Sequence, residues 1–564
     1  MSVAPYFATC GILLAGVMSS HGKIKLLTGS SSNTVHEHDS TLLDLSTNGD
    51  VVLFSSGPPA VGGTPGIALA GLYVRKISSN TLRFAGDPLA PAAVEASFSD
   101  NGRYITWRGT DSFIYWRDSI ANVTRLITPA ADGLSRRPVM SADGRYVAYA
   151  SKASNVVSNK GKLQQVPARP GVYLYDSITQ KTVVVSLTQS GDSLDTGIGS
   201  PTNVPNAGNE FDFSSDGKYI VFSSDAKNAH PGRPSNFPAT YLCIYRRNLA
   251  TGALDLLNEN AAGSVADGNF YSPRISGNGA RVTFFGQSVG VFQGIKMINS
   301  VPSNFSIDLY VKEVGSGDVW WVTKTTDNFA SDGAYSPYNV ISGDGETVAF
   351  GSNSTRFVTE KTDPLPGNRS ASDVFRVDLG SAGKVKTTLV TSSPNASGNV
   401  DFRVGPLLPG NGDYVAFCTS QVEAMFGIGS NDTVNFQGFS VSEPAKPEIV
   451  VQQPAGSGLQ DGKDKKKFGS VTVGQESAAK TFTIKNIGTK TLKNLEVKKS
   501  GSHKGDFIVG PLAKTSLAPG KSTTFQVSFK PTAKDTRNAS LKISSNDFDE
   551  NPFDIKLVGT GVKP

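Results

Sequence analysis

Three short stretches contain residue types that could do chemistry. Gly286-Gln287-Ser288-Val289-Gly290 follows a strand-like segment and has the Gly-x-Ser-x-Gly spacing of a nucleophilic serine elbow. Asp195-Thr196-Gly197 has the form of a triplet in which paired aspartates share a proton. His36-Glu37-His38-Asp39 could supply imidazole and carboxylate ligands to a divalent metal ion.

The surroundings of these stretches argue against catalysis. The serine elbow needs a following helix, whereas the chain after Ser288 enters another strand-rich insertion. The Asp195 triplet has no second copy to share its proton. Adjacent side chains in an extended loop point apart, so a metal at His36 and His38 would need help from His230 or from loop carboxylates. We therefore predict no catalytic residue, no cofactor and no firm metal site.

A repeated hairpin occupies most of the 564-residue chain. The copy that begins at Phe211 reads FDFSSDGKYIVFSS, in which Asp216-Gly217 suits a tight reversal between two strands. The apolar run from Tyr219 to Phe222 must be covered on both faces, as in sheets that stack side by side. The turns of the copies are Ser46-Thr47-Asn48-Gly49, Asp100-Asn101-Gly102, Ser141-Ala142-Asp143-Gly144, Ser214-Ser215-Asp216-Gly217, Gly277-Asn278-Gly279, Gly343-Asp344-Gly345 and Gly410-Asn411-Gly412.

Further strands follow each hairpin, such as GLYVRKI from Gly71 and VTRLIT from Val123. Four antiparallel strands in each of seven units predict a seven-bladed β-propeller over residues 23–442. The seventh unit lacks an obvious fourth strand, and residues 23–28 have the character of one without a blade of their own. We expect them to pair onto the last blade and close the ring.

The repeats resemble the TolB-like, PD40-type propeller repeats of bacterial envelope and secreted proteins, a WD40-like class. The resemblance is carried most closely by Ser141 to Tyr149 and Ser214 to Phe222, while Asn278 and Asn411 replace the usual Asp. It implies a fold and almost no chemistry.

Loop lengths distinguish the two ends of the predicted ring. Connections between the second and third strands are long, as in residues 151–169 and 223–239, whereas the hairpin turns are short. Long loops on a rigid scaffold concentrate binding, so we predict that this end is the functional face. The candidate ligand-binding residues on it are His36, His38, His230, Asp195, Asp267 and Asp332.

The sequence changes in character after a Pro-containing linker that begins at Glu443. We assign 443–464 to the linker and the start of the tail module, and 465–564 to an Ig-like sandwich, because strands alternate and turns recur about every ten residues. Phe468-Gly469-Ser470-Val471, Leu517-Ala518-Pro519-Gly520 and Phe529-Lys530-Pro531 resemble the choice-of-anchor D module, which is related to ASPM/SPD-2/Hydin domains. Candidate metal ligands with alternating oxygen spacing are Asp547, Asp549 and Asn551.

The net charge of +6 is concentrated in the tail. From Glu443 onward there are 20 Lys and Arg against 12 Asp and Glu, and Arg537 is the single Arg. A Lys-rich surface with few aromatic residues argues against nucleic acid and predicts a solvated face, with attraction to a polyanion such as an acidic polysaccharide as the alternative. Cys10, Cys243 and Cys418 have neither disulfide nor zinc spacing.

Residues 1–22 contain the apolar run from Ile12 to Val17 and are assigned as a possible signal segment, although no cation precedes the run. No stretch has the length of a transmembrane helix. We predict an exported, non-enzymatic binding or scaffold protein of the extracellular space, periplasm or cell surface, with a protein or polysaccharide partner. A carbohydrate-active lyase or hydrolase and a structural assembly subunit remain the alternatives.

Overall fold

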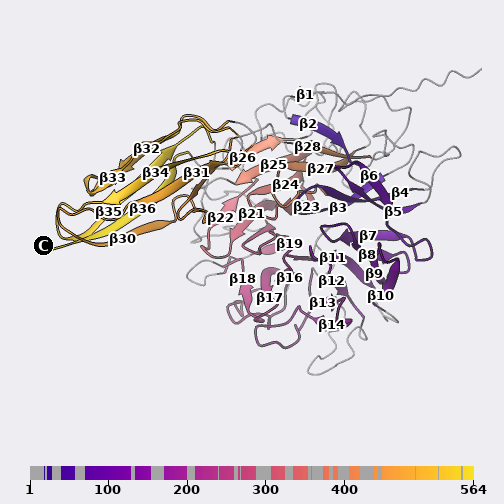
Figure 1. Cartoon of the computed structure of the whole chain (residues 1–564). Helices are drawn as coiled ribbons and strands as arrows, with labels where there is room; N and C mark the ends of the chain where they lie inside the picture. Colours follow the sequence, from indigo (N-terminus) through magenta and orange to yellow (C-terminus); the bar gives the residue numbers. More distant parts are fainter. Residues whose placement is uncertain are drawn as a thin grey trace, which may run out of the picture. The chain divides into compact units, whose positions relative to one another are not determined.

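The structure is a computed structural model, and the chain divides into two compact units (Figure 1). The first unit comprises residues 1–378 and 385–442, and the second comprises 379–384 and 443–564. The residues that the structure describes are 18–19, 22–27, 40–57, 70–128, 134–153, 170–199, 210–238, 241–259, 265–266, 268–287, 307–323, 335–352, 357, 373–379, 385–390, 405–419, 437–442, 447–488, 491–518, 520–547 and 551–563.

Seven four-stranded antiparallel sheets are described in the first unit. Six of them use four consecutive strands each. These strands are β3 (Ser40–Leu45), β4 (Val51–Ser56), β5 (Gly71–Lys76) and β6 (Thr81–Phe84); β7 (Ala93–Phe98), β8 (Tyr104–Gly109), β9 (Ile114–Asp118) and β10 (Val123–Leu126); β11 (Ser135–Met140), β12 (Tyr146–Ser151), β13 (Gly171–Asp176) and β14 (Lys181–Val184); β15 (Phe211–Phe213), β16 (Tyr219–Ser224), β17 (Cys243–Asn248) and β18 (Leu254–Leu256); β19 (Asn269–Ile275), β20 (Arg281–Gln287), β21 (Ile307–Glu313) and β22 (Val319–Trp321); and β23 (Tyr335–Ile341), β24 (Thr347–Ser352), β25 (Asp373–Leu379) and β26 (Val385–Leu389).

The remaining sheet of this unit joins the two ends of the repeat region. Its order is β1 (Met18–Ser19), β2 (Gly22–Leu26), β28 (Gln437–Ser442) and β27 (Tyr414–Thr419). Ile24 lies opposite Val441, and Leu26 lies opposite Phe439. A strand from the start of the chain therefore covers the edge that β28 would otherwise leave open.

The core of the first unit lies between neighbouring sheets. On β16, Ile220 and Phe222 pack with Ala148 and Val172 of the preceding sheet, whereas Val221 packs with residues of the following sheet such as Phe284. Each second strand is thus buried on both faces, which explains its continuous apolar sequence. In the same way, Val52 and Phe54 share a cluster with Ala416 and Cys418, so β4 packs against β27.

Buried cations on the third strands tie neighbouring sheets together. Arg247 donates hydrogen bonds to the carbonyls of Leu187 (3.3 Å) and Thr188 (3.1 Å), just beyond the last strand of the preceding sheet. Lys312 donates to the carbonyl of Glu259 at 2.9 Å in the same arrangement. Burial lowers the pKa of both side chains, yet each reaches carbonyl acceptors that stabilise its charged form.

The second unit is a sandwich of two four-stranded sheets. Its sheet orders are β29-β31-β34-β33 and β30-β36-β35-β32, with bounds β29 (Ile449–Gln452), β30 (Lys465–Thr472), β31 (Lys480–Asn486), β32 (Glu496–Ser500), β33 (Phe507–Val509), β34 (Ser522–Phe529), β35 (Asp535–Ser544) and β36 (Phe553–Val562), together with the 3-10 helix η2 (Lys504–Asp506). Phe482, Phe525, Leu541 and Ile555 belong to the buried core between the sheets. The predicted fold class, all-β with a propeller and an Ig-like sandwich, is confirmed. Because β29 already pairs with β31, the sandwich begins inside the segment 443–464.

Candidate functional site

Six of the seven repeat turns are held by their own side chains, and the seventh has Pro409 where the others have Ser. In the fourth sheet, the Ser214 hydroxyl donates to Asp216 Oδ1 (2.7 Å), and the same oxygen accepts from the backbone N–H of Lys218 (3.1 Å). The Ser214 oxygen also accepts from the N–H of Tyr219 (2.9 Å), and Gly217 has a φ of 75°, which favours glycine. The same contacts recur in the turns that begin at Ser46, Ser99, Ser141, Ser276 and Ser342.

The seven turns are joined to one another by a closed ring of hydrogen bonds. Six links run from a backbone N–H of one turn to a backbone carbonyl of the next. At the remaining link the Asp100 carboxylate accepts from the N–H of Thr47 (2.8 Å) and from its hydroxyl. The six backbone links are Asp100 to Ala142 (2.9 Å), Ala142 to Ser215 (2.9 Å), Asp216 to Gly277 (3.1 Å), Gly277 to Gly343 (2.8 Å), Asp344 to Gly410 (2.7 Å) and Gly410 to Thr47 (2.6 Å).

Glycine at the second turn position allows three of these turns to approach closely. A Cβ on Gly343 would lie 2.9 Å from the Cα of Gly410, and a Cβ on Gly410 would lie 2.7 Å from the carbonyl oxygen of Thr47. A Cβ on Gly277 would lie 3.1 Å from Gly343. These glycines are therefore required by backbone contact between sheets.

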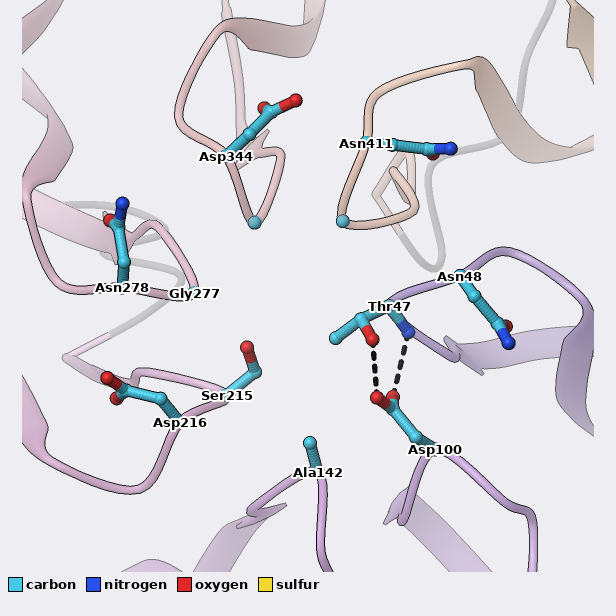
Figure 2. A pocket seen from close by; sticks show the side chains of 12 residues that line it. Thr47, Asn48, Asp100, Ala142, Ser215, Asp216, Gly277, Asn278, Asp344 and Asn411 are labelled. Carbon is cyan, nitrogen blue, oxygen red and sulfur yellow. Dashed lines mark hydrogen bonds between the residues drawn. The ribbon is translucent and has the colours of Figure 1, made fainter. Parts of the chain in front are cut away.

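The ring of turns surrounds an open cavity of about 680 Å³ (Figure 2). Figure 2 shows the side chains of Thr47, Asp100, Ala142 and Ser215 directed toward its centre, whereas those of Asn48, Asp216, Asn278, Asp344 and Asn411 lie farther out. The full lining is Thr47, Asn48, Asp100, Ala142, Ser215, Asp216, Gly277, Asn278, Gly343, Asp344, Gly410 and Asn411. We name this cavity the axial pocket. Its lining offers hydroxyl, amide and carboxylate groups to a ligand.

A second carboxylate supports the link between the first two sheets. Asp44 on β3 accepts hydrogen bonds from the Ser97 hydroxyl (2.7 Å) and from the backbone N–H of Phe98 (3.1 Å) on β7. Asp44 is half-buried as a residue, and protein atoms replace most of the water around its carboxyl group. This desolvation disfavours the charged form and raises the pKa of Asp44 to about 6. The hydrogen bonds oppose this rise, and the charge of Asp100 adds to it.

The first strands of four successive sheets, β7, β11, β15 and β19, carry acidic and basic residues in turn. Arg137 lies within a register shift of β11, has a φ of 53°, and donates its backbone N–H to Glu95 at 2.7 Å. Burial and the charge of Arg274 lower the pKa of Arg137 to about 10, while Asp212 and Glu210 oppose that change. The Nη1 atom of Arg274 lies 3.5 Å from the Oδ1 atom of Asp212. The cations and carboxylates balance one another, so this region serves to hold sheets together.

Two residues of the predicted loop face are described: Asp195 joins two loop segments, and His230 stabilises a turn. Asp195 Oδ1 accepts from the backbone N–H of Lys227 (3.1 Å), and its own N–H donates to Asn228 (3.0 Å). His230 Nδ1 accepts from the N–H of Gly232 (3.0 Å). His36, His38, Asp267, Asp332 and Ser288 lie outside the described residues, so the loop face stays a prediction.

The candidate metal ligands of the tail occupy a turn. Asp547 is buried, and its Oδ2 accepts from the N–H of Ile449 at 2.7 Å. Asn551 accepts from the N–H of Ser545 at 3.2 Å, and Asp549 lies outside the described residues. Within the described ranges, no group of three or more His, Cys, Asp or Glu side chains is arranged to hold a metal ion.

Sequence reasoning missed the axial pocket, which lies at the hairpin-turn end of the sheets, opposite the predicted loop face. The signal was the second residue of each turn, Thr47, Asp100, Ala142 and Ser215 and then Gly277, Gly343 and Gly410. Equivalent positions of a closed ring meet near its axis, so comparing the second turn residue across the repeats could have located the pocket.

None of the helices in the described part of the chain has the length and apolar character needed to cross a membrane.

Comparisons with known proteins agree with the architecture of the second unit. A family model described as HYDIN/CFA65/VesB-like, Ig-like domain matches residues 461–560. This match supports the Hydin-like part of the resemblance; the TolB-like and choice-of-anchor D assignments stay predictions. A search of curated proteins finds no match.

Several solved structures are similar to this chain. An oligogalacturonate lyase in complex with manganese is 11% identical, with a TM-score of 0.41 over 75% of this chain and 98% of its own. An oligogalacturonate lyase from Vibrio parahaemolyticus is 10% identical, with a TM-score of 0.43 over 75% of this chain and 97% of its own. The β-propeller domain of Myceliophteria thermophila Cps50 (Swd1) is 11% identical, with a TM-score of 0.36 over 69% of this chain and 96% of its own.

Proposed function

We propose that this chain is a non-enzymatic binding and scaffold protein of the bacterial envelope or extracellular space. Its propeller holds a protein or glycan partner, and its Ig-like unit acts as an attachment or spacer module with affinity for polyanions. The observation that carries the proposal is that the Asp100 carboxylate, in the lining of the axial pocket, is already hydrogen-bonded to a neighbouring turn. The Asp100 carboxylate is occupied by the N–H and hydroxyl of Thr47, so it holds the ring together instead of activating a nucleophile.

The remaining polar groups of the axial pocket suit hydrogen bonding to a ligand. The Ser215 hydroxyl is directed toward the centre and has no imidazole among the residues that line the pocket. The carboxyl of Asp344 uses Oδ1 to accept from Ser342 and from the N–H of Glu346, which leaves Oδ2 for other donors. Such fixed donors and acceptors favour recognition of a polar partner such as a glycan.

The test is a glycan array probed with the full chain and with two matched variants. Ala142→Trp fills the axial pocket, whereas Ala280→Trp adds the same side chain at an exposed position of another turn, outside the pocket lining. We expect Ala142→Trp to lose binding and Ala280→Trp to keep it. If both variants bind as well as the natural chain, the site lies elsewhere, with the loop face as the candidate. Depletion of the glycan with or without added divalent metal would favour the lyase or hydrolase alternative.

A further inference from the structure

The Ig-like unit has two outward sheet faces that differ in their number of lysines. Its inward residues, such as Leu541, Ile555 and Phe482, form the core, so residues that alternate with them point outward. The outward positions of the sheet β30-β36-β35-β32 include five lysines, Lys465, Lys467, Lys498, Lys542 and Lys556. We name these the lysine face. The outward positions of β29, β31, β34 and β33 include one lysine, Lys485.

Strand register places the cations of the lysine face side by side. Lys465 lies opposite Lys556 on the paired strands β30 and β36, and Lys498 lies opposite Lys542 on β32 and β35. Like charges at directly opposite positions destabilise a sheet. The fold thus accepts a cost that polar residues at the same positions would avoid, and an anionic partner would relieve it.

Carboxylates neutralise only one end of this face. Lys498 Nζ lies 2.8 Å from Glu496 Oε2, and Lys542 Nζ lies 3.0 Å from Asp554 Oδ2. Lys465, Lys467 and Lys556 have no carboxylate partner among the residues that the structure describes. The uncompensated cations therefore lie on β30 and β36, and all three are exposed.

The chemistry of the face favours one kind of polyanion. Ser500, Ser540 and Asn538 occupy outward positions among the lysines, which gives hydroxyl and amide groups beside the positive charges. No aromatic residue occupies an outward position of these four strands, so the face offers no stacking platform for bases. Its outward apolar residues are Val558 and Val562 on β36, and no Leu, Ile, Phe or Trp of the kind that inserts into a lipid surface lies among the outward positions.

We propose that the lysine face binds an acidic polysaccharide, with Lys465, Lys467 and Lys556 as the principal contacts. This inference rests on the proposed attachment role of the Ig-like unit and locates it on one sheet. The bound carboxylates or sulfates neutralise the cross-strand pair of Lys465 and Lys556, and the serine and asparagine side chains hydrogen-bond to sugar hydroxyls.

The test measures binding of the full chain to immobilised alginate and to heparin at low and at high salt. Lys465→Glu/Lys556→Glu reverses two charges on the lysine face, whereas Lys485→Glu/Lys521→Glu makes the same change in net charge at exposed positions elsewhere on the unit. We expect the first variant to bind about tenfold or more weakly at low salt, and the second to stay within about threefold of the natural chain. Lys465→Gln/Lys556→Gln, which adds no repulsion, should show an intermediate loss, and melting temperatures verify folding.

Several outcomes would overturn the inference. Equal losses in the two charge-reversed variants would mean that net charge, not this face, controls binding. Binding of the natural chain to DNA or to phosphatidylglycerol vesicles but to neither polysaccharide would reject the ligand class. If the natural chain binds no polyanion at all, the attachment role fails too, while the Ala142→Trp comparison still reports separately on the axial pocket.

Discussion

The carboxylate of Asp100 accepts two hydrogen bonds from Thr47, one from its backbone N–H and one from its hydroxyl, across the boundary between the first two sheets. The equivalent links between the other turns use a backbone carbonyl as the acceptor. A side chain thus completes the ring at this junction, where Asp44 adds a second carboxylate that accepts from β7. Because this junction depends on side chains, point mutations and changes of pH test it directly.

Replacing Asp100 with Ala should destabilise the first unit by about 1–3 kcal/mol, because the N–H of Thr47 loses its acceptor. Chemical denaturation checks this value. Asp192→Ala serves as the control, since Asp192 is exposed and its change should cost less than about 0.5 kcal/mol. Equal stability of the two variants would show that the ring does not depend on this link.

Stability should depend on pH through Asp44. Its pKa is about 6 in the folded chain against an ordinary 3.8, so the folded state binds more protons between these values. The contribution of Asp44 therefore falls as pH rises from about 4 to about 6 and stays low above that. Asp44→Asn should be more stable than the natural chain at pH 8, by up to about 3 kcal/mol, and the gain should disappear near pH 4. A gain of the same size at both pH values would contradict the assignment.

Gly343→Ala should destabilise the chain by about 1–3 kcal/mol, because the new Cβ would lie 2.9 Å from the Cα of Gly410. Gly315→Ala, in the turn between β21 and β22, is a matched control because a Cβ there meets nothing within 4 Å. Thermal unfolding of both variants gives the comparison. If Gly315→Ala is the more damaging change, close contact between turns is not the reason for glycine at position 343.

The segment that completes the last sheet should be necessary for stability. Leu27 is 1% exposed and packs in the cluster that joins β4 with β27, and Arg75 donates to its carbonyl at 3.3 Å. Leu27→Ala should cost about 2–5 kcal/mol. Leu126→Ala, on an outer strand where Leu126 is 40% exposed, should cost far less. Deletion of residues 22–27 with no change in the melting temperature would refute the closure.

The repeats could be predicted because their information is local. Ser214, Asp216 and Gly217 fold one turn through contacts within six residues, and the apolar run after it announces a strand covered on both faces. The family match at 461–560 likewise agrees with the alternating strands of the tail.

The axial pocket could not be predicted in the same way. Thr47 and Asp100 are 53 residues apart, and Gly410 reaches Thr47 from the opposite end of the repeats. Such contacts exist only once the sheets close around one axis, so neither residue carries a local signal of its role. The raised pKa of Asp44 has the same origin, because it results from the packing of two sheets.

The central claim, that the axial pocket binds a ligand without transforming it, is tested most directly by mass balance on a glycan that the array identifies. The natural chain is incubated with that glycan, with and without divalent metal, and the glycan is then recovered and analysed by mass spectrometry. Saturable binding that Ala142→Trp abolishes and Ala280→Trp preserves, with the glycan recovered unchanged, is the predicted result. Recovery of shortened or unsaturated products would contradict it.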